Sequence, residues 1–296
     1  MDIRNLKGSI VALVTPFHDD GSVNFEKLRE LVNWHIASGT DAILTLGTTG
    51  ESATMTHEED DDTLRCVIDA AAGRVPVIAG TGSNSTQTML EKSLRAEALG
   101  ADGLLLITPY YNKANPEGMY RHFAAVADAV HIPCILYNVP GRTGCALPVP
   151  VVERLARHPN ICGIKEASGD MSYAMKIAHC IGPDFALWCG NDDITLPLLA
   201  IGGSGVISVW ANVMPRQCHD MVMDYLSGRR EQALAAAVEH LELMNGLFME
   251  VNPIPVKTAL NLMGWAVGPF RLPLCDMSQE HQDALRGLLE KEGLLA

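Results

Sequence analysis

The chain has 296 residues, enough for one large domain with a sizeable core, since a (β/α)8 barrel alone takes about 250 residues. Hydrophobic residues make up 48 % of the chain and charged residues 19 %, a composition typical of globular proteins and not of disordered ones. The formal net charge of −13 repels phosphate backbones and argues against nucleic-acid binding, although local cations can still hold a small anionic substrate.

Short apolar runs rich in β-branched residues alternate with segments of helical periodicity along the first two thirds of the chain. The runs lie at 9–14, 42–46, 75–79, 103–107, 133–137, 161–165, 185–189 and 205–209. Between the first two runs, apolar residues in 25–37 recur at three- and four-residue steps and so share one face of a helix. Asn24 is expected to cap this helix, without a capping-box partner at Lys27.

This alternation predicts parallel strands joined by helical crossovers. Eight strand candidates favour a closed (β/α)8 TIM barrel over an open doubly wound sheet, since no G-x-G-x-x-G opens a helix after the first strand. Beyond residue 214 the strand candidates stop, and 215–227, 229–249, 254–264 and 278–291 are predicted as helices. We therefore expect a barrel over 1–214 and a helical C-terminal extension over 215–296 that packs on it.

Reacting groups in such barrels lie at the C-terminal ends of the strands. Polar, hydroxylated and glycine-rich segments follow five of the predicted strands, at Gly47–Ser52, Thr108–Asn112, Tyr137–Gly144, Lys165–Gly169 and Cys189–Asp192. These segments are predicted to meet at one end of the barrel, which makes that end the candidate active site.

Lys165 ends an apolar strand that is expected to be buried on both faces. A buried ammonium is unfavourable unless it is paired or loses its proton. Two interpretations stay open from the residues alone. Lys165 either forms a salt bridge with a neighbouring acid, or it is an amine of lowered pKa that attacks a carbonyl to form a Schiff base.

Three further features have both a structural and a chemical interpretation. Tyr137 is either a core residue with one satisfied hydroxyl or a phenol that relays protons. The turn Gly47–Gly50 offers backbone donors and the hydroxyls of Thr48 and Thr49 to a carboxylate, but glycine-rich turns are common. Arg142 is either a solvated surface charge or a bidentate clamp for a second carboxylate.

Metal binding is not expected. The acidic run at 57–62 is typical of a helix N-terminus, where carboxylates complement the helix dipole, and its spacing matches no known metal site. The eight cysteines include no C-x-x-C pair, which favours reduced thiols in the cytoplasm over disulfides or zinc. The first residues contain no apolar stretch long enough for a signal peptide or a membrane span, so we expect a soluble, cytoplasmic protein.

At these motifs the chain resembles the dihydrodipicolinate synthase and N-acetylneuraminate lyase superfamily, and within it the synthases most closely. The resemblance extends over essentially the whole chain. It rests on Gly8–Val11, Gly47–Ser52, Thr108–Asn112, Tyr137–Gly144, Ile164–Gly169, Gly205–Ser208 and Asn252–Lys257. It favours the Schiff-base interpretation of Lys165.

The resemblance implies roles for the residues of the site. Lys165 would condense with pyruvate, Thr48 and Thr49 would hold its carboxylate, and Tyr137 would relay protons. Tyr111 would reach into the site of a neighbouring subunit of a homotetramer and complete a hydroxyl chain with Tyr137 and Thr48. No metal or organic cofactor is implied, because the lysine itself supplies the electron sink.

The resemblance also bears on the substrates. Backbone carbonyls of Gly190 and Ile207 would line the pocket, and Arg142 would bind the carboxylate of L-aspartate 4-semialdehyde. This implies a lyase of lysine and diaminopimelate biosynthesis that acts on small molecules. The alternative is another pyruvate-dependent aldolase of the superfamily, acting on N-acetylneuraminate or a keto-deoxy sugar acid.

Family members that lysine inhibits bind it at a subunit interface. The matching positions here are Ser52, Ala53, His57, Asn84 and Tyr110. Thr88, however, stands where a glutamate is expected, and Asp60 where a second histidine is often found. Loss of a carboxylate that pairs with the ammonium of lysine weakens binding by on the order of 1.5–3 kcal/mol, so weak or absent inhibition by lysine is expected.

Overall fold

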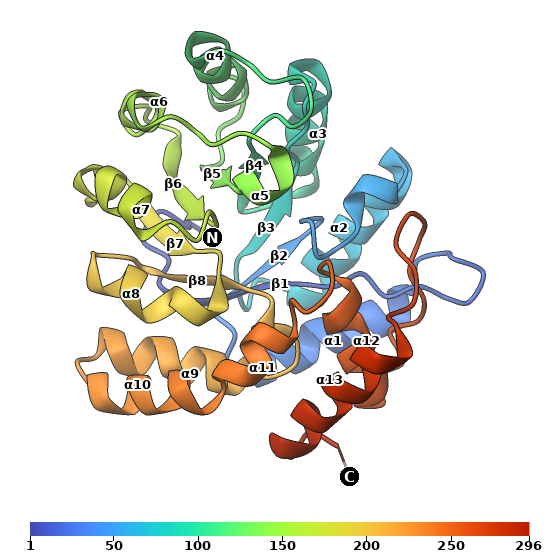
Figure 1. The fold of residues 1–296 in the computed structure, drawn as a ribbon. Helices are drawn as coiled ribbons and strands as arrows, with labels where there is room; N and C mark the ends of the chain where they lie inside the picture. Colours follow the sequence, from blue (N-terminus) through green and yellow to red (C-terminus); the bar gives the residue numbers. More distant parts are fainter. Residues whose placement is uncertain (296) are drawn as a thin grey trace.

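The computed structural model describes residues 1–295 and contains a closed barrel of eight parallel strands, β1 to β8, in chain order (Figure 1). The strands are β1 Gly8–Ala12, β2 Ala42–Thr45, β3 Val77–Gly80, β4 Gly103–Ile107, β5 Cys134–Asn138, β6 Ile161–Glu166, β7 Ala186–Cys189 and β8 Gly205–Ser208. Pairing of β8 with β1 closes the ring. The predicted (β/α)8 TIM barrel and all eight strand positions are confirmed, with strand ends displaced by at most two residues.

Helices surround the barrel, as Figure 1 shows. They are α1 Phe25–Ala37, α2 His57–Ala71, α3 Thr86–Leu99, α4 Pro116–Ala127, α5 Pro140–Thr143, α6 Val149–Leu155, α7 Met171–Ile177, α8 Thr195–Ala200 and α9 Pro215–Leu226. Short 3-10 turns lie at Ser52–Thr54, Ala178–Cys180, Asp192–Ile194 and Trp210–Asn212.

Side-chain caps begin the first two helices. Asn24 accepts a hydrogen bond from the backbone N–H of Lys27 at 2.9 Å, so the predicted cap of α1 is confirmed. The acidic run at 57–62 forms the start of α2, as predicted. Thr56 and Glu59 close a capping box around that helix end, which satisfies backbone N–H groups that the helix itself leaves free.

The C-terminal extension contains α10 Arg230–Glu239, α11 Leu241–Gly246, α12 Ile254–Leu262 and α13 Gln279–Lys291. In Figure 1 these helices form the orange-to-red layer along one side of the barrel. The single helix predicted at 229–249 is wrong, because the chain breaks at His240, whose backbone leaves helical geometry. Residues exposed before the break, such as Val238, give way after it to the buried Leu243 and Met244.

The division of the chain at residue 214 stays a prediction. The structure adds that α9 packs on β1, β8 and α8, in the place of a barrel helix. The helices after α9 also contact barrel elements, since α10 packs on α8 and α12 on the turn Trp210–Asn212.

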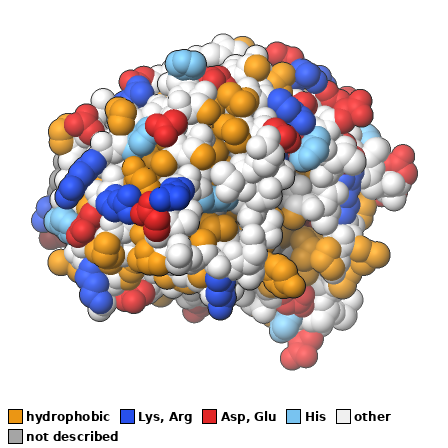
Figure 2. Space-filling model, turned by 90° about the horizontal axis from the view of Figure 1, so that it is seen from above, with side chains coloured by type: hydrophobic (Ala, Val, Ile, Leu, Met, Phe, Trp, Pro, Cys, Tyr) orange, Lys and Arg blue, Asp and Glu red, His pale blue; other side chains and the backbone are white. Residues whose placement is uncertain are grey.

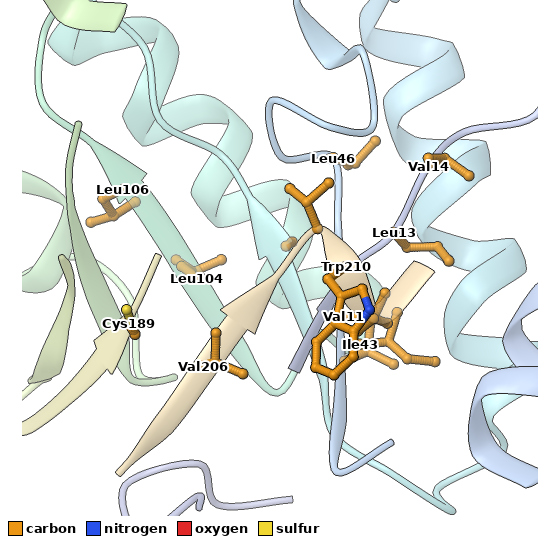
Figure 3. Packing of buried hydrophobic residues seen from close by; sticks show 14 of the residues in the cluster. Val11, Leu13, Val14, Ile43, Leu46, Leu104, Leu106, Cys189, Val206 and Trp210 are labelled. Carbon is orange, nitrogen blue, oxygen red and sulfur yellow. The ribbon is translucent and has the colours of Figure 1, made fainter. Parts of the chain in front are cut away.

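Two apolar clusters form the core. One fills the inside of the barrel and includes Ile10, Leu44, Tyr137, Trp188 and Ile207. The other lies between the strands and the helices; Figure 3 shows some of its members, with Trp210 beside strand residues such as Val11 and Ile43. Inward and outward side chains therefore alternate along the strands. Because all eight strands are parallel, their C-terminal ends meet at the same opening of the barrel.

The surface carries charges of both signs. Acidic and basic side chains are interspersed with apolar ones over the face shown in Figure 2. All eight cysteines are free thiols. No helix within residues 1–295 combines the length and apolar character that crossing a membrane requires.

The strand pair that closes the barrel has no room for side chains at its first position. Gly205 faces Gly8, and a Cβ on Gly205 would overlap the Gly8 carbonyl oxygen. We therefore expect Gly205→Ala to force β8 away from β1 and to destabilise the fold by about 1–3 kcal/mol. Chemical denaturation measures this. Gly182→Ala is the matched control, because nothing lies within 4 Å of that position, and an unchanged Gly205→Ala stability would refute the prediction.

Candidate active site

A cavity of about 490 Å³ opens at the C-terminal ends of the strands. It is lined by residues that follow five different strands and by the segment that leads into α12. The predicted site residues found in its wall are Thr48, Thr49, Tyr137, Arg142, Lys165 and Gly190. The barrel thus gathers at one point predicted site residues that are up to 142 positions apart in the chain, from Thr48 to Gly190.

Lys165 lies on β6 with its side chain directed into this cavity, and the residue is only 5 % exposed. Burial lowers the pKa of its amine to about 8, while the carboxylate of Asp192 acts in the opposite direction. Lys165 forms no ion pair within residues 1–295, in contrast to the other buried lysine, Lys257, whose nitrogen lies 2.7 Å from Glu51 Oε1. Of the two interpretations of Lys165, the geometry favours the amine of lowered pKa.

Tyr137 is the neighbour of Lys165 in the sheet. The two residues are register partners on β5 and β6, and Lys165 Nζ lies 4.7 Å from the centre of the Tyr137 ring. Burial raises the pKa of the Tyr137 phenol, and a hydrogen bond with the Thr48 side chain works against that shift. A protonated phenol therefore stands beside the amine, in reach of a group bound to it.

The residues after Tyr137 and Lys165 point to the other side of the sheet and bind each other. Asn138 Nδ2 donates to Glu166 Oε2 at 2.7 Å, and Glu166 Oε1 accepts from the Ser168 backbone N–H at 2.6 Å. Asn138 Oδ1 accepts from the Leu147 N–H at 2.9 Å. These bonds fix β5 against β6 and so hold the two inward side chains side by side. No role was predicted for Asn138 or Glu166, although each directly follows a predicted site residue in the chain, Tyr137 or Lys165.

The turn after β2 carries Thr48 and Thr49 and is held on two sides. The Thr49 hydroxyl accepts a hydrogen bond from Asn252 Nδ2 at 3.0 Å. The Thr15 hydroxyl donates to the Gly50 carbonyl at 2.7 Å. The turn is therefore fixed before any ligand binds.

Arg142 lies in α5 at the cavity wall, and its Nη2 donates to the Asn252 carbonyl at 3.1 Å. Asn252 thus bridges Thr49 and Arg142, and its own Oδ1 is buried without a partner among the described residues. Sequence reasoning noted the Asn252–Lys257 motif but did not place it in the site. Asn252 follows no strand, and it lies 110 positions from Arg142 in the chain.

Of the two residues whose backbone carbonyls were expected to line the pocket, only Gly190 lies in the cavity wall. Gly190 lines the cavity and must be small, because a Cβ there would lie 3.0 Å from Lys165 Cε and would overlap Ala167. Ile207 is fully buried on β8 and is absent from the described cavity wall.

Asp192, to which we assigned no role, accepts hydrogen bonds from the Val209 and Trp210 N–H groups at 3.1 and 2.9 Å and fixes the chain after β8.

A second cavity of about 320 Å³ lies against the first, and Gly47, Thr48, Leu105 and Tyr137 line both. Most of the residues considered for regulation line this second cavity, and Asn84 does not. Those that line it are Ser52, Ala53, His57 and Tyr110, together with the two departing positions Asp60 and Thr88.

The second cavity also contains a lysine that the sequence did not point to. Lys92 Nζ lies 2.9 Å from Asp60 Oδ2 and 3.3 Å from the Ser52 hydroxyl. Both partners of this ion pair are largely buried, at 14 % and 5 % side-chain exposure. An ammonium of the chain itself therefore already occupies part of the wall.

Tyr111 stands apart from both cavities. Its side chain is 91 % exposed, and its backbone has a φ of 66°, in the left-handed region.

Within residues 1–295 no group of three His, Cys, Asp or Glu side chains is arranged to hold a metal ion.

Comparison with known proteins agrees with this geometry. The family model of the dihydrodipicolinate synthetase family matches residues 5–292. The 4-hydroxy-tetrahydrodipicolinate synthase of Thermoanaerobacter sp. (strain X514) is 50 % identical over 290 residues, which cover 98 % of this chain and 97 % of the relative.

Solved structures also match over almost the whole chain. The dihydrodipicolinate synthase of Acinetobacter baumannii, complexed with pyruvate, has a TM-score of 0.96 and 42 % identity, covering 98 % of this chain and 100 % of that one. The enzyme of Cyanidioschyzon merolae with lysine bound has a TM-score of 0.95 and 42 % identity, covering 98 % and 99 %. The chain belongs to the dihydrodipicolinate synthetase family.

Proposed function

We propose that the chain is a 4-hydroxy-tetrahydrodipicolinate synthase, a lyase that condenses pyruvate with L-aspartate 4-semialdehyde in lysine and diaminopimelate biosynthesis. The observation that carries this is the unpaired, buried Lys165 amine beside the Tyr137 phenol. A relative that is 50 % identical over 98 % of this chain bears that name, and one solved relative is complexed with pyruvate.

The residues support a Schiff-base mechanism. The free Lys165 amine attacks C2 of pyruvate, and loss of water leaves an iminium ion. Loss of a proton from the C3 methyl group gives an enamine, whose C3 attacks the aldehyde carbon of the second substrate. The amino group of that substrate then attacks C2 and expels the Lys165 amine, which closes the ring and regenerates the enzyme. Tyr137 is placed to carry protons in the steps at C2.

The fixed turn after β2 fits the pyruvate carboxylate. Thr48 and Thr49 offer hydroxyls and backbone N–H groups near Lys165, and the anchors of the turn limit the entropy lost when an anion binds. We also propose that the backbone carbonyl of Gly190 lines the substrate pocket, whereas Ile207, the second residue expected there, is buried on β8 and is not part of the cavity wall.

Arg142 separates the proposed substrate from the alternatives. Its guanidinium is tied by one nitrogen to Asn252, which leaves further donors for a carboxylate. The alternative, an aldolase that uses N-acetylneuraminate or a keto-deoxy sugar acid, would share Lys165, Tyr137 and the turn. It would hold its aldehyde by other contacts.

We further propose a homotetramer in the cytoplasm. An aromatic side chain as exposed as Tyr111, on a strained backbone beside the barrel opening, is well placed to enter a neighbouring subunit and join Thr48 and Tyr137 there. A monomeric chain with full activity would contradict this role of Tyr111.

Borohydride trapping tests the Schiff base. With pyruvate present, borohydride is expected to add the mass of a reduced pyruvate adduct at Lys165, and the trapping rate is expected to rise with pH towards a pKa of about 8 as the amine loses its proton. Peptide mass spectrometry locates the adduct. Lys165→Arg keeps the charge but cannot form the imine, so it should give no adduct and no turnover.

The control for trapping is Lys176→Arg, an unrelated lysine on α7 that should leave the adduct unchanged. Absence of any pyruvate adduct at Lys165 would sink the mechanism. Turnover of N-acetylneuraminate or keto-deoxy sugar acids, with none of aspartate semialdehyde, would replace the proposed substrate by the alternative.

Arg142→Lys is expected to raise the KM for aspartate semialdehyde by about 10- to 100-fold, because lysine keeps the charge but loses the fork that binds a carboxylate through two bonds. The concentration of pyruvate that half-saturates trapping should change far less. Steady-state kinetics with each substrate varied in turn measures both values. Arg121→Lys, on the exposed side of α4, is the control, and equal losses for both substrates would contradict a clamp specific to the aldehyde.

Lysine is expected to inhibit weakly or not at all. Thr88 offers no carboxylate, and the Asp60 carboxylate that lines the cavity is already paired with Lys92, whose charge repels the ammonium of an incoming lysine. Titration of the activity with lysine checks this, and Thr88→Glu should strengthen inhibition by about ten- to a hundredfold. A sub-millimolar inhibition constant for the unchanged chain would overturn the expectation.

A further inference from the structure

Lys257 is the second fully buried lysine, and it lies in α12 of the C-terminal extension. Its ammonium is 2.7 Å from Glu51 Oε1, and both side chains are at most 1 % exposed. It also donates to the Pro269 carbonyl at 2.7 Å and lies over the Phe17 ring, 4.4 Å from its centre. The amine is thus surrounded by partners, and no part of it faces the active-site cavity, whose wall does not include it.

Glu51 is the last residue of the turn after β2. Its backbone has a φ of 55°, a left-handed conformation that a glutamate adopts only where its surroundings hold it. Its Oε2 accepts from the Arg271 N–H at 3.2 Å, so both carboxylate oxygens are bound by the extension.

Three consecutive residues of the turn are therefore anchored by side chains from elsewhere. Thr49 is bound by Asn252, Gly50 by Thr15, and Glu51 by Lys257. Two of these anchors come from the extension, more than 200 positions away in the chain. Thr48, which lines the same cavity as Lys165, directly precedes this anchored stretch.

We propose that the Lys257–Glu51 ion pair is a positioning device that sets the Thr48–Thr49 turn for the substrate carboxylate. The proposal rests on the proposed function, since it takes pyruvate to be the ligand of the turn. Lys257 touches no reacting atom in this role; it acts through Glu51. A pair that only stabilised the fold would be replaceable, because apolar substitutes for a buried ion pair are often neutral or stabilising.

The test compares pyruvate saturation with stability. Glu51→Gln keeps the shape of the side chain but removes its charge. It is expected to raise the pyruvate KM by about tenfold while kcat changes by less than about threefold, the pattern for loss of a contact made equally in ground and transition states. The KM for aspartate semialdehyde should stay near the unchanged value. The pyruvate concentration that half-saturates borohydride trapping gives the same comparison without the second substrate.

Glu292→Gln is the matched control. Glu292 forms the other buried carboxylate pair of the extension, 2.7 Å from His240, with side chains 8 % and 9 % exposed. It does not touch the turn, so it should lower the unfolding temperature without moving the pyruvate KM. The double variant Glu51→Gln/Lys257→Met removes both charges and should recover stability, while its pyruvate KM stays raised.

The outcomes separate this proposal from the function on which it rests. If the unchanged chain is trapped by pyruvate but Glu51→Gln saturates at the same pyruvate concentration, the positioning role is wrong. The positioning role is also wrong if the double variant recovers pyruvate binding together with stability. If Glu51→Gln alone does not fold, the double variant provides the test instead. If the unchanged chain forms no pyruvate adduct, the proposed function itself fails.

Discussion

The burial of the Lys165 amine is the constraint on which the rest of the site depends. Desolvation lowers the pKa of this amine to about 8, and a carboxylate paired directly with it would keep the proton in place. The fold must therefore keep an amine in an apolar barrel without giving it a counter-ion. It does so by supplying Tyr137 as a polarisable neighbour, and by locking β5 to β6 from the outside through Asn138 and Glu166.

The two buried lysines show how surroundings decide the chemistry of one residue type. Lys257 is enclosed by a carboxylate, a carbonyl and an aromatic ring. Lys165 has the ring but lacks the other two partners, and it faces a cavity. The first is held by three partners, whereas the second has no hydrogen-bonded carboxylate or carbonyl beside it among residues 1–295. Sequence analysis singles out only Lys165 as a buried amine, because it ends an apolar strand, whereas Lys257 enters it only as the last residue of the Asn252–Lys257 motif.

Much of the barrel, and the position of Lys165 and Tyr137 in it, could be predicted from the sequence. The strands were found because each is a short apolar run, and Lys165, Tyr137 and Thr48 because each follows or ends one. The contacts made by Asn252, Lys92 and Lys257 were not predicted, because they join segments whose meeting depends on how helices pack and not on periodicity. The break at His240 was missed because most residues on either side of it are good helix formers.

The shared wall of the two cavities has a kinetic consequence. Tyr137 and Thr48 present one side to the amine and the other to the second cavity. Gly47, Thr48, Leu105 and Tyr137 line both spaces, so no relay through distant elements is needed to connect them. A molecule that filled the second cavity would exclude water from the far side of the phenol and restrict its hydroxyl. With Tyr137 as the proton relay that we propose, such a ligand would change how fast protons move, and so the turnover rate, more than how tightly a substrate is held.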